Sequence, residues 1–405
     1  MTIRINTFER LTISKTLIRI TSLMFSTFFL WKIFIDTHSI IEDGLIPAFS
    51  LVGYLIISLP GGIILDKFRR SRVFFFVSIV PVFAYLFLFY SSDLIVLYIV
   101  DVIISMISGF TSDIINTIMK DFVAEENIGK ASSLLIGTRA LSDLLGLLAG
   151  GLGLLIGMNI FLSLIVGLSI VSIPLSLPVK GENRPTKSEK SISKIGRIIY
   201  ILMPVLLLAL IVNGFFVCID VFAAALVESV MHGSVIEYTI FLLGFPVGMI
   251  TGSLISSKHH DKFSKGGIMV IELVLMGSLL ILLGLDKNPL IPFFITFPMG
   301  LASAFLNISL QTLFIKIIPS NLLGRIGSLT NFLAIGSSPV MALFWTALSS
   351  KVYFPLIFVY SGIAISITSV IFLPALIKLV NEYGSKPEPN NTSKLQVMQD
   401  DELLP

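Results

Sequence analysis

Charged residues are scarce in this chain. Lys, Arg, Asp and Glu make up 13% of its 405 residues, and hydrophobic residues make up 55%. A soluble domain usually carries about 25% charged residues. The mean hydropathy is correspondingly high, at +0.96. This composition excludes a water-soluble globular protein and predicts an integral membrane protein.

Cysteine is almost absent as well. Cys218 is the single cysteine, so no disulfide can form within the chain. No group of His, Cys, Asp and Glu has metal-ligand spacing. The chain also lacks a Gly-x-x-x-x-Gly-Lys-Ser/Thr phosphate loop and a Gly-x-Ser-x-Gly nucleophile elbow. We therefore expect no metal, no cofactor, no nucleic-acid partner and no enzymatic activity.

Long apolar runs fill most of the sequence. Each approaches the roughly 20 residues that a spanning helix needs, and backbone groups without partners in hydrocarbon require these runs to be helical. The sequence thus predicts an all-α protein with about twelve spans. These are Thr16–Ile35, Leu45–Leu65, Val73–Tyr90, Leu94–Met119, Ala131–Ile156, Asn159–Val179, Ile198–Ala225, Ile236–Ser256, Gly267–Leu285, Pro289–Ile315, Gly327–Leu348 and Val352–Leu373.

Lysine and arginine gather on alternate connections between the spans. One side carries the N-terminal bases, the cluster at 66–72 and the polar stretch at 180–197, whereas the other side has only Lys287 and Lys351. That other side carries acids instead: Asp36, Glu42, Asp43, Asp93, Glu228, Glu237 and Asp286. By the positive-inside rule, we expect both termini of a multi-pass cell-membrane protein to be cytoplasmic.

The polar stretch Lys180–Arg197 divides the chain. It is rich in Lys, Ser and Glu and cannot bury itself, as is also true of the tail. The predicted organisation is an N-terminal six-helix half at 1–179, a cytoplasmic linker at 180–197, a C-terminal six-helix half at 198–383 and a disordered tail at 384–405.

A repeat with an offset of 195 residues relates the two halves. The segment "DKFRR" at Asp66–Arg70 corresponds to "DKFSK" at Asp261–Lys265, and Gly129 of a Gly-Lys turn corresponds to Gly324 of a Gly-Arg turn. An even number of helices in each copy predicts parallel halves, related by an axis along the membrane normal.

These features resemble the major facilitator superfamily. Its signature loop reads Gly-x-x-x-Asp-Arg-x-Gly-Arg-Arg/Lys, and this chain has Gly62, Asp66 and Arg70 at the matching positions, with Lys67 replacing the first arginine. The resemblance implies a transporter fold of two six-helix halves that rock about a central site.

The signature is not complete. Arg69 stands where the family has glycine, Ser71 replaces a base, and the second copy keeps Asp261 and Lys262 but lacks the glycine. In the family, the loop aspartate caps a helix N-terminus, whose dipole favours negative charge. The loop bases pair with acids at the inner end of the fourth helix, for which Asp113 is a candidate here. The alternative is a cluster that only fixes the topology.

A second resemblance lies in the fifth span. Gly146, Gly150 and Gly151 match the antiporter signature Gly-x-x-x-Gly-Pro-x-x-Gly-Gly, but Leu147 stands in place of its proline. The stretch Ser108–Ser133 is most similar to macrolide-efflux and related drug–proton antiporters. The alternative is that these glycines only let helices pack closely.

Ionisable groups inside spans are expensive and are treated as functional candidates. Asp101 heads a serine stripe on the fourth span, about 10 Å inside the surface. A buried carboxylate favours its neutral form and could carry a proton, or it could serve as a structural hydrogen-bond partner. Asp220, with Asn213 on the same helix face, either lines the central cavity or ends its span.

Further candidates lie on spans that line the cavity in the related family. Asn307 and Gln311 follow one face of the tenth span and offer donors and acceptors to a solute, or else join helices. Lys32 and Asp36 are four residues apart and can form a pair, although Lys32 could only extend to the interface.

Two more acids have open interpretations. Arg139 and Asp143 are also four residues apart and are expected to form either a gate between the halves or a structural pair. Glu272 lies near the inner end of a peripheral span, where a structural or lipid-facing role is favoured.

Together these features predict a secondary transporter that moves a small solute by alternating access. Proton-coupled efflux by a monomer in contact with membrane lipid is the leading hypothesis. Uptake or facilitated diffusion of a metabolite or lipid, and a non-transporting sensor on the same fold, are the alternatives.

Overall fold

The protein is described here from a computed structural model. It defines the backbone of residues 2–91, 93–122, 128–178, 192–263, 266–318, 326, 330, 332–333 and 336–383. Within these residues all of the regular structure is helical, which confirms the predicted all-α class.

The first half of the chain, called the N-half below, contains six helices. They are α1 (Thr2–Thr37), α2 (Ile40–Lys67), α3 (Arg70–Phe87), α4 (Leu94–Phe122), α5 (Ile128–Gly153) and α6 (Met158–Leu175). The second half, called the C-half, begins with α7 (Ile192–Phe216), α8 (Cys218–Ala225) and the π-helical turn η2 (Leu226–Val230). It continues with α9 (Val235–Phe263), α10 (Gly266–Leu285), α11 (Ile291–Ile317), α13 (Ser338–Ser349) and α14 (Pro355–Tyr383).

Ten of these helical runs, searched within the described residues, are long and apolar enough to cross a membrane. The helices α7, α8 and η2 count as one such run, because hydrogen bonds from Val217 N to Asn213 O and from Val221 N to Val217 O carry the helix across the junction. The shorter apolar α13 and the 26-residue α5 account for the other two predicted spans.

Several helix ends differ from the prediction. Helix α2 continues to Lys67 and α9 to Phe263, so the charged segments that we expected in loops form the last turns of these helices. A helix can continue beyond the apolar zone into a charged segment, because charged side chains do not interrupt the backbone hydrogen bonds. A prediction from hydropathy alone therefore places the ends of these helices too early. The predicted span Gly327–Leu348 contains a turn at 336–337, after which α13 begins with Pro339 in its first turn, a position that suits proline.

Helix pairing follows the same pattern in both halves. In the N-half, α2 packs on α4, α3 on α6, and α1 on α5 and α6. In the C-half, the corresponding helices pair as α9 with α11, α10 with α14, and α7 with α13 and α14. This agreement is what two copies of one six-helix unit would produce. The exact division at 180–197 stays a prediction, because most of the linker lies outside the described residues.

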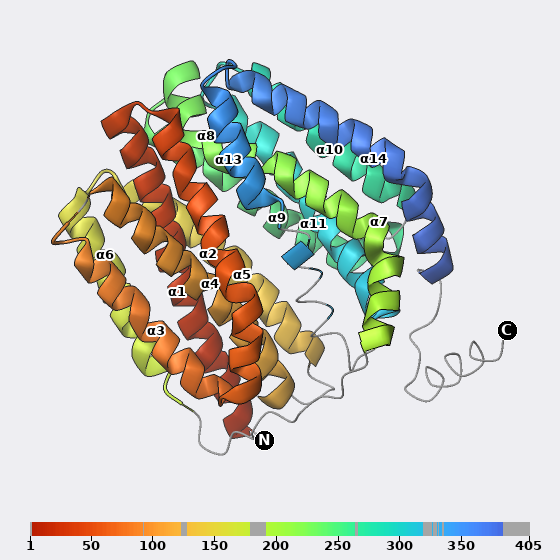
Figure 1. The fold of residues 1–405 in the computed structure, drawn as a ribbon, viewed down its shortest axis with the longest axis horizontal. Coiled ribbons are helices and arrows are strands. Elements are labelled where there is room, and N and C mark those ends of the chain that lie inside the picture. Colours follow the sequence, from red (N-terminus) through yellow and green to blue (C-terminus); the bar gives the residue numbers. More distant parts are fainter. Residues whose placement is uncertain are drawn as a thin grey trace.

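The two ends of the molecule differ in charge. The end with Arg10, the α2–α3 connection at Lys67–Arg72 and Arg197 is called the basic end, and the end with Asp36, Asp93 and Asp286 is called the acidic end. Figure 1 shows the two halves side by side, with α8 and α13 of the C-half next to α2 of the N-half.

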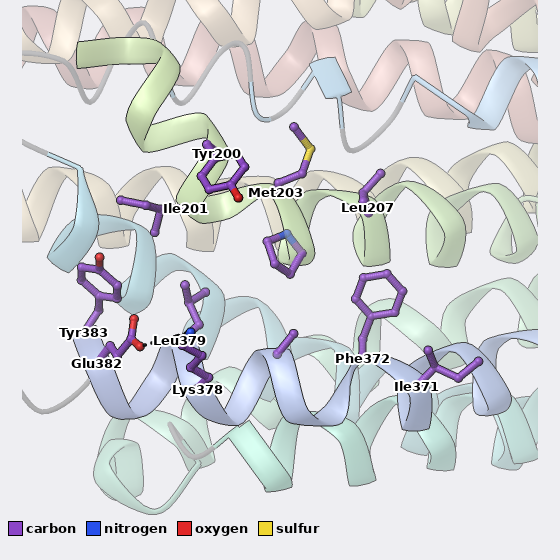
Figure 2. Close-up of a pocket in the computed structure, with 12 residues that line it drawn as sticks. Tyr200, Ile201, Met203, Leu207, Ile371, Phe372, Lys378, Leu379, Glu382 and Tyr383 are labelled. Carbon is purple, nitrogen blue, oxygen red and sulfur yellow. Dashed lines mark ion pairs between the residues drawn. The ribbon is translucent and has the colours of Figure 1, made fainter. Parts of the chain in front are cut away.

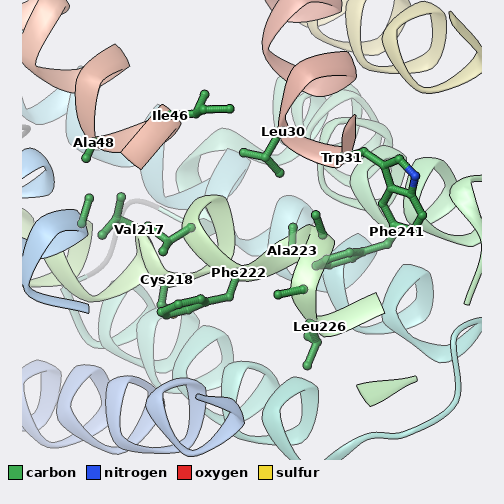
Figure 3. Packing of buried hydrophobic residues seen from close by; sticks show 14 of the residues in the cluster. Leu30, Trp31, Ile46, Ala48, Val217, Cys218, Phe222, Ala223, Leu226 and Phe241 are labelled. Carbon is green, nitrogen blue, oxygen red and sulfur yellow. The ribbon is translucent and has the colours of Figure 1, made fainter. Parts of the chain in front are cut away.

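The halves touch through an apolar seam near the acidic end. Helix α2 packs against α8 and α13, and α5 packs against α9. Figure 3 shows buried side chains from both halves meeting there, including Leu30 and Ile46 from the N-half and Val217 and Phe222 from the C-half. The rings of Trp31 and Tyr238 also meet across the seam, with centroids 4.8 Å apart. The seam therefore closes the acidic end of the space between the halves.

Candidate transport site

Close packing of α5 on α1 sets the geometry of the N-half site. A Cβ added to Gly146 would lie 3.1 Å from the Ile20 carbonyl oxygen, and one added to Gly150 would lie 2.8 Å from that of Met24. Only glycine lets the two backbones approach this closely. The glycines that resembled an antiporter signature therefore act as helix-packing contacts here.

This packing places four charged side chains together. Arg19 Nε donates to Asp143 Oδ1 over 2.5 Å between α1 and α5. Lys15, four residues before Arg19, and Arg139, four residues before Asp143, lie close enough to interact electrostatically with this pair. The expected partnership of Arg139 with Asp143 is thus replaced by an interhelical pair, because α1 lies directly against the α5 face that carries Asp143.

Two more helices contribute to this cluster. Tyr54 of α2 lies against α4, where a Cβ on Gly109 would overlap its ring. The Tyr54 hydroxyl lies within electrostatic range of Asp113, Arg139 and Arg19. The N-half site thus combines Lys15, Arg19, Arg139, Asp113, Asp143 and Tyr54, drawn from α1, α2, α4 and α5.

The cluster includes side chains that water can reach. The side chain of Arg139 is exposed and that of Asp113 is half-exposed. We infer that these groups of α5 and α4 face the space between the two halves. We refer to this space as the central space.

The C-half carries exposed polar groups as well. Asp220 of α8 is exposed, and α8 packs on α1, α2, α13 and α14. Asp220 makes no hydrogen bond or ion pair with the described part of the chain. Asn213 and Asn307 are exposed too, and their amide groups donate to the Ala209 and Ser303 carbonyls of their own helices, each over 2.8 Å.

The chain as a whole can now be compared with known proteins. The sequence profile described as "Major Facilitator Superfamily" matches residues 11–338. The chain belongs to the major facilitator superfamily. No individually curated protein matches it by sequence.

Solved structures of superfamily members share its fold. The nucleoside transporter NupG superimposes with a TM-score of 0.72 at 12% identity, over 92% of this chain and 99% of NupG. A bacterial homolog of the human lysosomal transporter Spinster, solved in an inward-facing and unoccupied conformation, gives 0.70 at 15% identity, over 94% of this chain and 97% of that one. At these identities the likeness concerns the fold alone.

Asp101, which we expected in the central cavity of this superfamily member, is enclosed in the N-half. It is 2% exposed, and its Oδ2 accepts a hydrogen bond of 2.6 Å from Ser50 Oγ of α2. The carboxylate therefore joins α4 to α2 in this conformation and has no open path to the central space. Its role as a proton carrier stays a prediction.

The predicted pair of Lys32 and Asp36 is confirmed, with 2.7 Å between Nζ and Oδ2. Both side chains are partly exposed near the acidic end of α1, and they follow Trp31 of the seam. The pair thus lies at the closed end of the molecule.

The superfamily's signature loop spans the end of α2 and the start of α3. Gly62 is exposed, and a Cβ there would have no neighbour within 4 Å among the described residues. A Cβ added to the neighbouring Gly61 would lie 2.9 Å from the Phe110 ring, so Gly61 is the glycine that packs closely against α4. Lys67 is exposed and Arg70 is half-buried. The side chains of Asp66, Asp261, Lys262 and Gln311 lie outside the described residues.

A separate pocket of about 550 Å³ lies between α7 and α14 (Figure 2). It is largely apolar, and Lys378 and Glu382 form a loose pair at one end, 3.8 Å apart. Tyr200 and Ile371 in its lining are strongly exposed. The pocket therefore opens on the outer surface of the C-half, away from the central space. Among the described residues, no group of His, Cys, Asp and Glu is placed to hold a metal ion.

Sequence reasoning missed Lys15, Arg19 and Tyr54 as site residues. The two cations were attributed to the basic N-terminus, because Lys15 precedes the predicted first span, which begins at Thr16, and Arg19 lies in the first turn of that span. A signal was nevertheless present: the apolar run begins near Thr7, and both cations then fall inside it at a spacing of four residues.

Proposed function

We propose that this chain is a proton-coupled secondary transporter that carries a small solute through the central space by alternating access. The observation that carries the proposal is the contrast between the two ends. Apolar side chains seal the halves at the acidic end, while Arg139 and Asp220 remain accessible between them. A transporter caught in one of its two access states has this arrangement.

The excess of lysine and arginine supports a cytoplasmic location for the basic end. In that orientation the described conformation is open to the cytoplasm. The good superposition on a homolog that was solved in an inward-facing conformation agrees with this assignment.

Asp220 is the preferred proton carrier. An exchangeable proton needs a carboxylate that water can reach in one state and that has no permanent cationic partner. Asp220 meets both conditions within the described residues, whereas Arg19 holds Asp143 and Ser50 binds Asp101. Export in exchange for protons is the expected mode, on the strength of the sequence likeness to drug–proton antiporters.

The test is transport by the purified protein in proteoliposomes. A solute identified by its stabilisation of the protein against heat is placed on one side, and a pH gradient is imposed in either direction. We expect the gradient to drive accumulation in the wild type. Asp220→Asn should lose accumulation but retain exchange of labelled for unlabelled solute, because exchange needs no net proton movement.

The matched control is Asp93→Asn, which removes an exposed acid at the acidic end. It should transport like the wild type. Accumulation by Asp220→Asn at the wild-type level would contradict the role of Asp220, and a wild type that moves no stabilising solute in either direction would contradict transport itself.

A further inference from the structure

Three cations meet two acids in the N-half cluster. Lys15, Arg19 and Arg139 lie within electrostatic range of one another and of Asp143, and Tyr54 lies within range of both Asp113 and this group. Counted together, the five charged groups leave one excess positive charge when all are ionised. Arg19 and Asp143 neutralise each other through their 2.5 Å contact. Lys15 and Arg139 make no ion pair or hydrogen bond with the described part of the chain.

The excess charge lies deep in the protein. Arg19 is three residues from the midpoint of the Thr7–Thr37 run, about 5 Å along the helix, and Lys15 is about 10 Å from it. Lys15 is only 6% exposed. A buried ammonium without a partner is strongly unfavourable, so a site of this kind favours an anion that can enter and pair with it.

Access to the site comes through Arg139. Its side chain is exposed and lies within electrostatic range of Arg19 and of the buried Lys15. A guanidinium presents paired N–H donors that match the two oxygens of a carboxylate or phosphate. The Tyr54 hydroxyl of α2, which lies within electrostatic range of Arg139 and Arg19, adds a neutral donor.

We propose that Lys15, Arg19 and Arg139 bind an anionic group, a carboxylate or phosphate with one net negative charge, on the transported solute. The proposal rests on the transport function proposed above and names its substrate class. One negative charge balances the excess of the cluster, and Asp143 serves as the internal counter-ion that holds Arg19 in place when the site is empty.

The experiment measures thermal stabilisation of the full chain in nanodiscs of neutral phosphatidylcholine. Matched pairs of probes are added: benzoate and benzamide, gluconate and glucose, and glycerol phosphate and glycerol. We expect at least one anion to stabilise the wild type while its neutral counterpart does not. Arg139→Gln should weaken that binding about 10- to 100-fold, as expected for loss of charged hydrogen bonds, and Arg139→Lys should fall between.

Two controls keep the outcome clear. Lys351→Gln removes an exposed cation from the acidic end and should bind the anion like the wild type. Nanodiscs that contain phosphatidylglycerol, without added solute, test an anionic lipid headgroup as the source of the same chemistry. Stabilisation that depends on Arg139 in either arm supports the anion site and identifies its source.

The proposal is overturned if no anion stabilises the wild type, or if Arg139→Gln binds the anion as tightly as the wild type does. It is also overturned if neutral or cationic solutes alone are transported. Transport of neutral or cationic solutes alone would contradict the anion site but would be compatible with alternating access. The absence of any transport would contradict the proposed transport function and would not test the charge of the solute.

Discussion

The contact at Gly44 predicts how the two access states can be shifted. Gly44 lies near the start of α2, and a Cβ added there would overlap Thr346 Oγ1 of α13 and lie 2.9 Å from Val221 Cγ1 of α8. Both neighbours belong to the C-half. A larger side chain at position 44 should therefore destabilise the access state in which the seam is closed. It should not destabilise the state in which the two halves have separated at the acidic end.

The magnitude follows from the cost of overpacking. Additional methyl groups in a filled space cost about 1–3 kcal/mol. If Gly44→Val costs about 2 kcal/mol in the closed-seam state alone, the ratio of the two states changes about 30-fold toward the state open at the acidic end.

The assay is maleimide labelling from the acidic side in a Cys218→Ser background. The reporter is Val217→Cys, which places a slightly smaller side chain at a seam position that is 3% exposed (Figure 3). Its labelling rate should rise about 30-fold with Gly44→Val. Gly167→Ala is the control, because a Cβ there meets nothing within 4 Å. Unchanged labelling in a folded Gly44→Val protein would refute the reasoning.

Three further predictions concern the gate, the topology and the enclosed acid. Asp66→Asn should slow transport while expression stays near normal, because the resemblance to the superfamily's signature loop leads us to expect that this carboxylate caps a helix in one access state; wild-type rates in proteoliposomes would exclude a gating role. Cysteines at Ser188 and Asn391, with Cys218 replaced by serine, should be labelled only from the cytoplasmic side of intact cells, and labelling of either from outside would reverse the proposed orientation. Asp101→Asn should retain exchange, since the amide can still accept from Ser50. A loss of pH-driven accumulation by this variant would identify a second proton site, whereas wild-type accumulation would identify a purely structural role.

The sequence was sufficient to predict the elements and their repetition. Hydropathy predicted about twelve spans, and ten helical runs within the described residues are long and apolar enough to cross a membrane. The prediction works because the bilayer imposes the length of a span and forces it to be helical. The match between Asp66–Arg70 and Asp261–Lys265 revealed the duplicated halves, and the helix pairing agrees with that duplication. These features depend on local composition and on chain order, both of which can be read directly.

The candidate site was harder to predict, since it depends on how the helices rotate and pair. Asp143 has a basic residue four positions away on its own helix, yet it pairs with Arg19 of α1. Asp101 appeared to face a cavity through its serine stripe, yet it turns toward Ser50. Spacing along one helix gives the face on which a residue lies, but the neighbour on that face depends on close contacts such as the one at Gly146.

The apolar character of the seam gives the two closures of this protein different physical sensitivities. Opening the seam separates side chains such as Val217 and Phe222 and exposes apolar surface to water. The hydrophobic attraction that holds these side chains together weakens on cooling. The basic end carries Lys67, Arg69 and Arg72 on its surface, and we expect its closure to depend on charge, which dissolved salt screens over about 8–10 Å. Cold should therefore loosen one end and salt the other. An experimenter could thus populate either access state by choosing the temperature and the ionic strength, without altering the chain.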